Sequence, residues 1–220
     1  MAGPAARAAN ETFRANVRFF NPITDTRDLY FRTQGEDREI RSTFNGPSGR
    51  YLYESESPRL LLYRMSGTGE EAQRTPVATV NLPETGQNYL VFLLPDRRNG
   101  TDSYLTRAFN DNTQTLPRGN TCIYNLSAAP IAVKYGESKL LVKEGSSGMV
   151  NNHKAKWMGL AGGSGEDTIS LDLPVQIAVK NDEKWKTVYR SVWYLNEEAR
   201  YKIFVIPETQ NTVRVVQVVD

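Results

Sequence analysis

The 220-residue chain contains a single cysteine, Cys122, and a single histidine, His153. One cysteine cannot form an intramolecular disulfide, so the fold must be stabilised by packing. One histidine and one cysteine do not supply the ligands of a typical zinc site. A catalytic thiolate would need His153 as its partner, whereas a buried structural thiol needs none. We therefore expect Cys122 to be buried and predict neither a metal site nor a cofactor.

Long apolar runs and an excess of one charge are also missing. No run approaches the roughly 20 apolar residues that cross a bilayer, which predicts no transmembrane segment. Lys and Arg number 27 and Asp and Glu 25, a net charge of +2. This balance argues against a dedicated nucleic-acid binder, which would carry a clustered basic excess.

The first 13 residues are small, Ala-rich and without the apolar stretch of an intact signal peptide. We interpret residues 1–13 as a disordered N-terminus that remains after a signal peptide has been removed. This interpretation predicts an extracytoplasmic location, in the periplasm or at the cell surface.

Motifs of common enzyme classes are absent. The Gly-rich string "GLAGGSGED" (159–167) lacks the Lys and Ser or Thr of a phosphate-binding loop, and no "GxSxG" elbow occurs. The acids of the first half lie in polar runs beside arginines, where solvated faces and ion pairs are expected. These acids are Asp25, Asp28, Glu36, Asp37 and Glu39. The sequence therefore predicts a protein that is not an enzyme.

What the sequence does contain is an internal repeat. "RANVRFFNP" (14–22) matches "RGNTCIYNL" (118–126) at one Arg, two Asn and an aromatic position. Later pieces match in the same order. "SPRLLLYR" (57–64) faces "LPVQIAVK" (173–180), with Pro58 matched to Pro174, "RTPVATVNL" (74–82) faces "KTVYRSVWY" (186–194), and "YLVFLLPD" (89–96) faces "YKIFVIPE" (201–208). We predict two diverged copies, at 14–112 and 118–220, joined by a linker at 113–117.

The matched pieces are short, rich in β-branched and aromatic residues, and separated by turn formers, which indicates strands. In "VQIAVK", Val175, Ile177 and Val179 share one face and Gln176 and Lys180 the other. "LPETGQN" and "LNEEAR" are expected to be hairpin loops. About seven strands per copy predict an all-β fold of two tandem immunoglobulin-like β-sandwich repeats. The alternatives are one composite sandwich with strands exchanged between the halves, or a small barrel for each half.

Two strings carry a resemblance. "FNDNTQTLPRGNTCIYNLSAAPIAVKYGESKLLVKEG" and, more loosely, "ANVRFFNPITDTRDLYFR" pass from a turn-rich lead into a strand, a polar turn and further strands. In this they resemble exported bacterial proteins with tandem immunoglobulin-like or transthyretin-like sandwich modules. The resemblance implies a sandwich fold in a periplasmic or surface setting, and it implies no catalytic or binding residues.

Candidate contact residues lie in the second copy, which holds all three tryptophans. Trp193 alternates like a core residue, whereas Trp157 and Trp185 stand beside lysines and could contact a ligand or partner. Our leading hypothesis is a non-enzymatic extracytoplasmic protein that contacts envelope or surface proteins, or a second copy of itself, through strand edges or loops. One alternative is a carbohydrate-binding module that uses the exposed Trp residues of the second copy. The other is a hydrolase with a site between the repeats.

Overall fold

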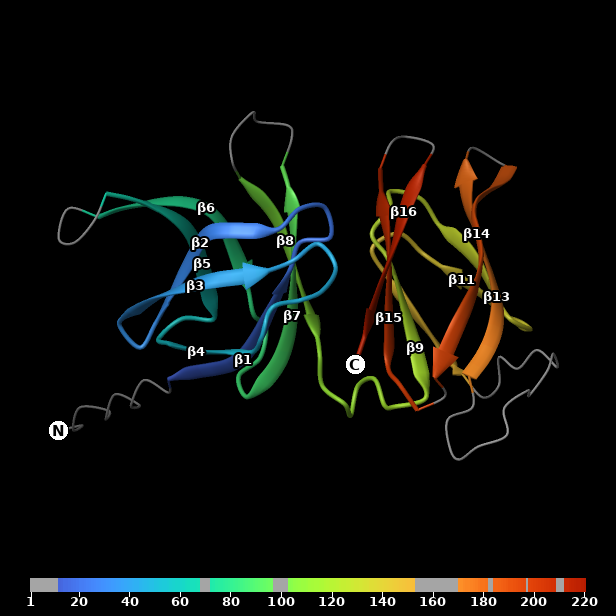
Figure 1. Cartoon of the computed structure of the whole chain (residues 1–220), viewed down its shortest axis with the longest axis horizontal. Helices are drawn as coiled ribbons and strands as arrows, with labels where there is room; N and C mark the ends of the chain where they lie inside the picture. Colours follow the sequence, from blue (N-terminus) through green and yellow to red (C-terminus); the bar gives the residue numbers. More distant parts are fainter. Residues whose placement is uncertain are drawn as a thin grey trace, which may run out of the picture. The chain divides into compact units, whose positions relative to one another are not determined.

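The computed structural model describes residues 12–67, 72–96, 103–152, 170–181, 184–196, 198–208 and 212–220 (Figure 1). The chain divides into two compact units between Asn112 and Thr113. The described residues form sixteen β-strands and no α-helix, so the fold is all-β, as predicted. Among these residues no helix is long and apolar enough to cross a membrane.

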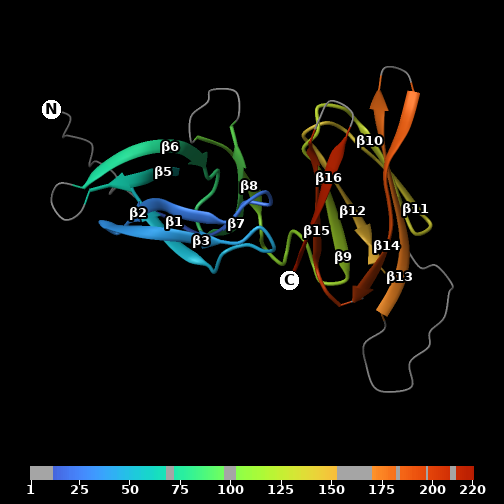
Figure 2. The same ribbon diagram turned by 45° about the horizontal axis from the view of Figure 1, so that its top comes forward.

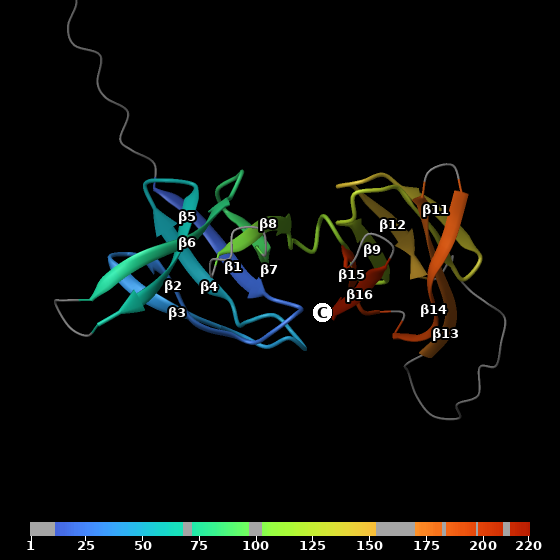
Figure 3. The same ribbon diagram turned by 90° about the horizontal axis from the view of Figure 1, so that it is seen from above.

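Unit 1 holds eight strands in two four-stranded sheets. They are β1 (Phe13–Phe20), β2 (Thr26–Thr33), β3 (Glu36–Ser42), β4 (Tyr51–Ser55), β5 (Arg59–Ser66), β6 (Gln73–Asn81), β7 (Gln87–Pro95) and β8 (Tyr104–Asn110). The strand orders are β4-β1-β7-β8 and β3-β2-β5-β6. Figure 3 shows β5 and β6 side by side in the second of these sheets.

Unit 2 repeats this arrangement strand for strand. Its strands are β9 (Asn120–Asn125), β10 (Ile131–Tyr135), β11 (Ser138–Val142), β12 (Ser147–Asn151), β13 (Ser170–Asn181), β14 (Lys184–Asn196), β15 (Tyr201–Pro207) and β16 (Val213–Val219). Their orders, β12-β9-β15-β16 and β11-β10-β13-β14, follow those of unit 1 when eight is added to each strand number. No described sheet mixes strands of the two units, which rules out strand exchange between the halves for this part of the chain.

The repeat extends to local pairing. In both units the first strand pairs in parallel with the seventh, as β1 with β7 and β9 with β15. A β-bulge also recurs, between Leu62 and Tyr63 of β5 and between Ile177 and Ala178 of β13. Bulges are specific local features of a ladder, so their recurrence at one position supports a common origin of the two units.

Three details of the sequence interpretation are wrong. The bulge makes Ile177 equivalent to Leu62, so Pro174 corresponds to Arg59 and the match with Pro58 is off by one residue. The segments 82–88 and 195–200 are not hairpin loops, because β6 and β7, like β14 and β15, lie in different sheets. β1 begins at Phe13, inside the predicted N-terminal tail; residues 1–11 lie outside the described part of the chain.

The immunoglobulin-like part of the fold prediction is not confirmed. In a constant-type immunoglobulin domain the first strand lies beside the second, and the sheets hold four and three strands. Here β1 lies between β4 and β7, and each unit has two sheets of four. The extra strands come from short or polar segments, such as β3 and β4, that the sequence did not separate from loops.

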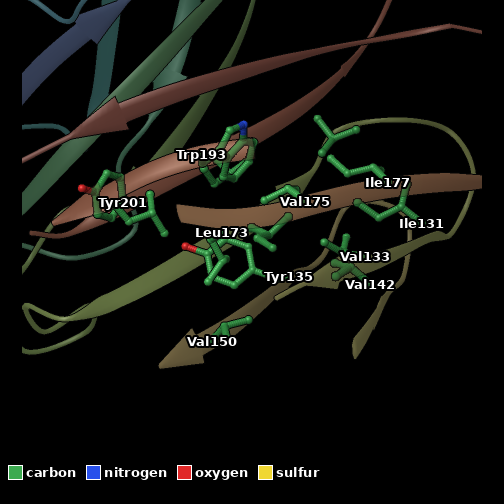
Figure 4. Packing of buried hydrophobic residues seen from close by; sticks show 14 residues of the cluster. Ile131, Val133, Tyr135, Val142, Val150, Leu173, Val175, Ile177, Trp193 and Tyr201 are labelled. Carbon is green, nitrogen blue, oxygen red and sulfur yellow. The ribbon is translucent and has the colours of Figure 1, made fainter. Parts of the chain in front are cut away.

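Each unit buries its own core between its two sheets. In unit 1, Val17 and Phe19 of β1 meet Phe31 of β2 and Leu62 of β5, and all four are fully buried. In unit 2 the alternation predicted for β13 is confirmed, because Val175 and Ile177 are buried against Val133. Figure 4 shows these three side chains within one cluster that also includes Trp193. Each unit is therefore a two-layer sandwich with one core.

Candidate functional site

Of the two predicted contact residues, the structure describes Trp185. It lies in β14 opposite Lys180 and is 46% exposed, so it is an exposed side chain of a strand. Trp157 lies outside the described residues, as do His153 and the string 159–167. Trp193 is 8% exposed and donates its indole N–H to Tyr189 Oη at 2.9 Å, which confirms its core role.

β14 forms an edge of its sheet along 13 residues. Within the described part of the chain, β13 is the only strand hydrogen-bonded to it, and Figure 2 shows the two as one long hairpin. Alternate residues of β14 therefore turn their backbone N–H and C=O groups away from the sheet. Val192 and Tyr194 are 51% and 73% exposed along this strand. A long edge of this kind can accept a further strand.

The equivalent strand of unit 1, β6, is blocked at two points. Pro76 stands opposite Tyr63, directly after the bulge, where it offers no N–H to an added strand. The carbonyl of Thr79 accepts a hydrogen bond of 2.7 Å from Thr106 Oγ1 of β8. By the same register, the residue of β14 that replaces Pro76 is Thr187, which keeps its N–H. The edge of the β11-β10-β13-β14 sheet is therefore open where its counterpart is closed.

The outer face of the same sheet carries a row of long polar side chains. Lys139 of β11 lies opposite Lys134 of β10, Lys134 opposite Gln176 of β13, and Gln176 opposite Arg190 of β14. Their sequence neighbours, such as Val133 and Ile177, point into the core, so the row points outward. With its amide oriented so that the oxygen faces Arg190, Gln176 accepts hydrogen bonds from Arg190 Nε and Nη2 at 2.8 and 3.2 Å.

Unit 1 has an ion-pair cluster at the equivalent place. The positions of Lys134 and Lys139 are those of Arg32 and Asp37, because each pair flanks a two-residue hairpin turn and is the second pair from that turn. Asp37 accepts hydrogen bonds from Arg74 Nη2 at 2.7 Å and from Tyr63 Oη at 2.6 Å. Arg32 Nη1 lies 3.9 Å from the same carboxylate.

Titration of this unit 1 cluster reflects its hydrogen bonds. The bonds from Arg74 and Tyr63 hold the pKa of Asp37 below its ordinary value. Burial, together with the bond to Asp37, raises the pKa of Tyr63 to about 12. Four of the five acids named from the sequence are ion-paired, as expected: Asp37 with Arg74, Asp25 with Arg27, Glu36 with Arg38 and Glu39 with Arg41.

Two further features of the described residues bear on the sequence predictions. Unit 1 has a hollow of about 680 Å³ bordered by Asp25, Asp28 and Phe44. Asp25 Oδ1 accepts the Phe44 N–H at 3.1 Å and so shapes the adjoining loop. Cys122 is buried as predicted, and burial raises the pKa of its thiol, which makes a reactive thiolate unfavourable. Among the described residues no group of three metal-ligating side chains occurs.

No protein-family model matches the chain, and a search of curated proteins finds no match either. Function must therefore be inferred from the two features of unit 2 that differ from unit 1. These are the open edge of β14 and the outer face beside Trp185.

Proposed function

We propose that this is a non-enzymatic, extracytoplasmic bacterial protein whose second unit binds an extended segment of an envelope or surface protein along β14. The observation that carries the proposal is that the edge of the 13-residue strand β14 is open at Thr187, whereas its counterpart β6 in unit 1 is closed by Pro76. Of the two kinds of sandwich module in the resemblance, the transthyretin-like one is the better comparison, because the strand order of each unit departs from the immunoglobulin order. The extracytoplasmic setting is proposed from the resemblance to exported bacterial proteins.

Strand addition supplies affinity through backbone hydrogen bonds and specificity through alternate side chains. A typical strand of five or six residues fits within the length of β14. The exposed Tyr194 and Val192 would then contact alternate side chains of the added strand. The partner segment can come from another protein or from β14 of a second copy, and light scattering after size exclusion distinguishes a self-paired dimer from a monomer.

The substitution Thr187→Pro tests the proposal, because it places in β14 the residue that unit 1 carries in β6. Wild-type protein and the Thr187→Ala control, which keeps the N–H, are expected to capture the same partner from an envelope fraction, or to dimerise. Thr187→Pro is expected to weaken that association at least tenfold. Equal association by all three proteins, at equal thermal stability, would overturn the proposal.

Carbohydrate binding is a second candidate. It is favoured by the 46% exposure of Trp185 beside the lysine-rich outer face. An exposed indole can stack on a sugar ring, and its fluorescence would report the contact. Titration across a glycan panel with no fluorescence change would exclude this candidate.

A further inference from the structure

The outer face of the β11-β10-β13-β14 sheet carries a row of cationic side chains. We call the row Lys139, Lys134, Gln176 and Arg190 the cationic band. It crosses all four strands, a width of about 14 Å at the usual strand spacing. Lys134 and Lys139 stand directly opposite each other, an arrangement that is unfavourable without an anion. No described residue forms an ion pair with either lysine.

The comparison with unit 1 shows what has changed. The register pair Arg32–Asp37, an ion pair in unit 1, is the like-charged pair Lys134–Lys139 in unit 2. The position of Arg74, which lies over the Tyr63 ring at 5.8 Å, is occupied by Trp185. The surface of unit 1 is thus neutralised by its own ion pairs, whereas the equivalent surface of unit 2 is cationic and carries an exposed indole.

On β10, β13 and β14 a row of short side chains separates the band from Trp185, and on β11 this row ends in the exposed Leu141. Ala132 lies opposite Ala178, and Ala178 lies opposite Thr187. The equivalent positions in unit 1 hold Tyr30, Tyr63 and Pro76, and the two tyrosine rings stack with centroids 6.5 Å apart. Beyond the short row, Lys180 and Trp185 form the next outward pair. A flat ligand can therefore approach the backbone between the band and the indole.

We infer that this face binds an acidic polysaccharide, a chain of sugar rings that bear carboxylate or sulfate groups. Lys134, Lys139 and Arg190 supply the charge-assisted hydrogen bonds to the acid groups. Trp185 supplies a stacking surface for one ring, and Lys180 adds a further cation beside it. The inference rests on the carbohydrate-binding candidate and is independent of the proposed edge at β14.

The direction of the band favours a polysaccharide over a peptide. An added peptide strand runs along β14, whereas the cationic band runs across the strands, where a ligand is held by side chains alone. Single-stranded nucleic acid is disfavoured because the chain's net charge is only +2, where such binders carry a clear basic excess. Charge complementarity and the exposed indole of Trp185 together favour a polyanion built of sugar rings.

The test uses the full chain and Trp fluorescence. Alginate, a polyuronate, is expected to shift the emission and to bind less tightly as salt is raised, whereas the neutral glucan dextran is expected to have no effect. Lys139→Asp restores the acid of unit 1 opposite Lys134 and is expected to weaken alginate binding at least tenfold. Arg118→Asp, the same charge change in the turn before β9, is the control and is expected to change it less than twofold. Trp185→Phe is expected to weaken binding severalfold.

Several results would overturn the inference. One is that alginate does not bind, and another is that dextran binds as tightly as alginate. A third is that Lys139→Asp and Arg118→Asp weaken alginate binding equally. Polyglutamate or single-stranded DNA binding as tightly as alginate would assign the face to those polyanions instead. Lys139→Asp distinguishes the two proposals, because it changes the cationic band and leaves the edge of β14 open. Thermal melting of each variant shows that the fold is retained.

Discussion

Each unit has an asparagine at the end of its first strand, and the two asparagines are equivalent. Asn21 Oδ1 accepts the N–H groups of Ile23 and Thr24 at 3.0 and 3.3 Å, and Asn125 Oδ1 accepts that of Ser127 at 3.0 Å. Both side chains are fully buried. The turn-forming role that an asparagine after a strand suggests is therefore present in both units.

The two asparagines differ in their amide groups, and so in their expected contribution to stability. Asn125 Nδ2 donates to three carbonyls, those of Ala129, Val142 and Lys143, at 2.8, 3.1 and 3.1 Å. Asn21 Nδ2 has no partner among the described residues. We expect Asn125→Ala to lower the free energy of unfolding by about 2–4 kcal/mol and Asn21→Ala by about 1 kcal/mol. Thermal denaturation of both variants measures this, and an equal or reversed order would contradict it.

Tyr63 should give unit 1 a distinct alkaline titration. Its pKa is raised to about 12, against about 10 in an unfolded chain. The neutral phenol is thus favoured by folding, so this contribution to stability is complete below pH 10 and is lost as pH rises toward 12. We expect Tyr63→Phe to remove one late tyrosinate step from the ultraviolet absorbance titration. Tyr194→Phe, at a 73% exposed ring, is the control and should retain that step. Retention of the late step in Tyr63→Phe would refute the assignment.

At the scale of elements, the equivalence of β6 and β14 predicts where β14 accepts a proline. Directly after β6, the Leu82 N–H donates to the Pro58 carbonyl at 3.0 Å, so the N–H groups of alternate residues of β6, such as Val80, face β5. Ser191 is the residue of β14 equivalent to Val80, and Thr187 is equivalent to Pro76. We expect Thr187→Pro to cost less than about 1 kcal/mol and Ser191→Pro about 3 kcal/mol or more. Denaturant unfolding checks both values, and equal costs would show that the registers are not equivalent.

Periodicity and repetition predicted the long apolar strands but not the short polar ones. β7 and β15 are apolar at nearly every position and lie at the centre of their sheets, as their sequences indicate. β3, with the sequence "EDREIRS", has only one apolar side chain, so its charge concealed its pairing with β2. Sheet assignment also escaped prediction, because a short connection between strands is compatible with a hairpin or with a crossing between sheets.

The cationic band could not be predicted for a related reason. Lys134 and Lys139 are five residues apart in sequence, but Arg190 joins them only through the pairing of β13 with both β10 and β14. The sequence did contain one indication of the band, because aligning the hairpin turns of the two units matches Lys139 with Asp37. That alignment required β3 and β11 to be recognised as strands.

At the scale of the whole molecule, each unit has its own core and completes its own two sheets. No core residue of one cluster belongs to the other in the described part of the chain. A cooperative transition requires that the groups losing contacts share a core. The two units are therefore expected to unfold as separate cooperative transitions.

The distribution of tryptophan makes this separation measurable, because all three tryptophans lie in the second repeat. Leu62→Ala and Ile177→Ala each remove a fully buried side chain at equivalent positions, with an expected cost of about 2–5 kcal/mol in the unit concerned. Ile177→Ala should lower the fluorescence melting midpoint. Leu62→Ala should leave that midpoint unchanged while it lowers a transition seen by circular dichroism, which reports both units. A fluorescence midpoint that falls equally in both variants would show that the two units unfold as one.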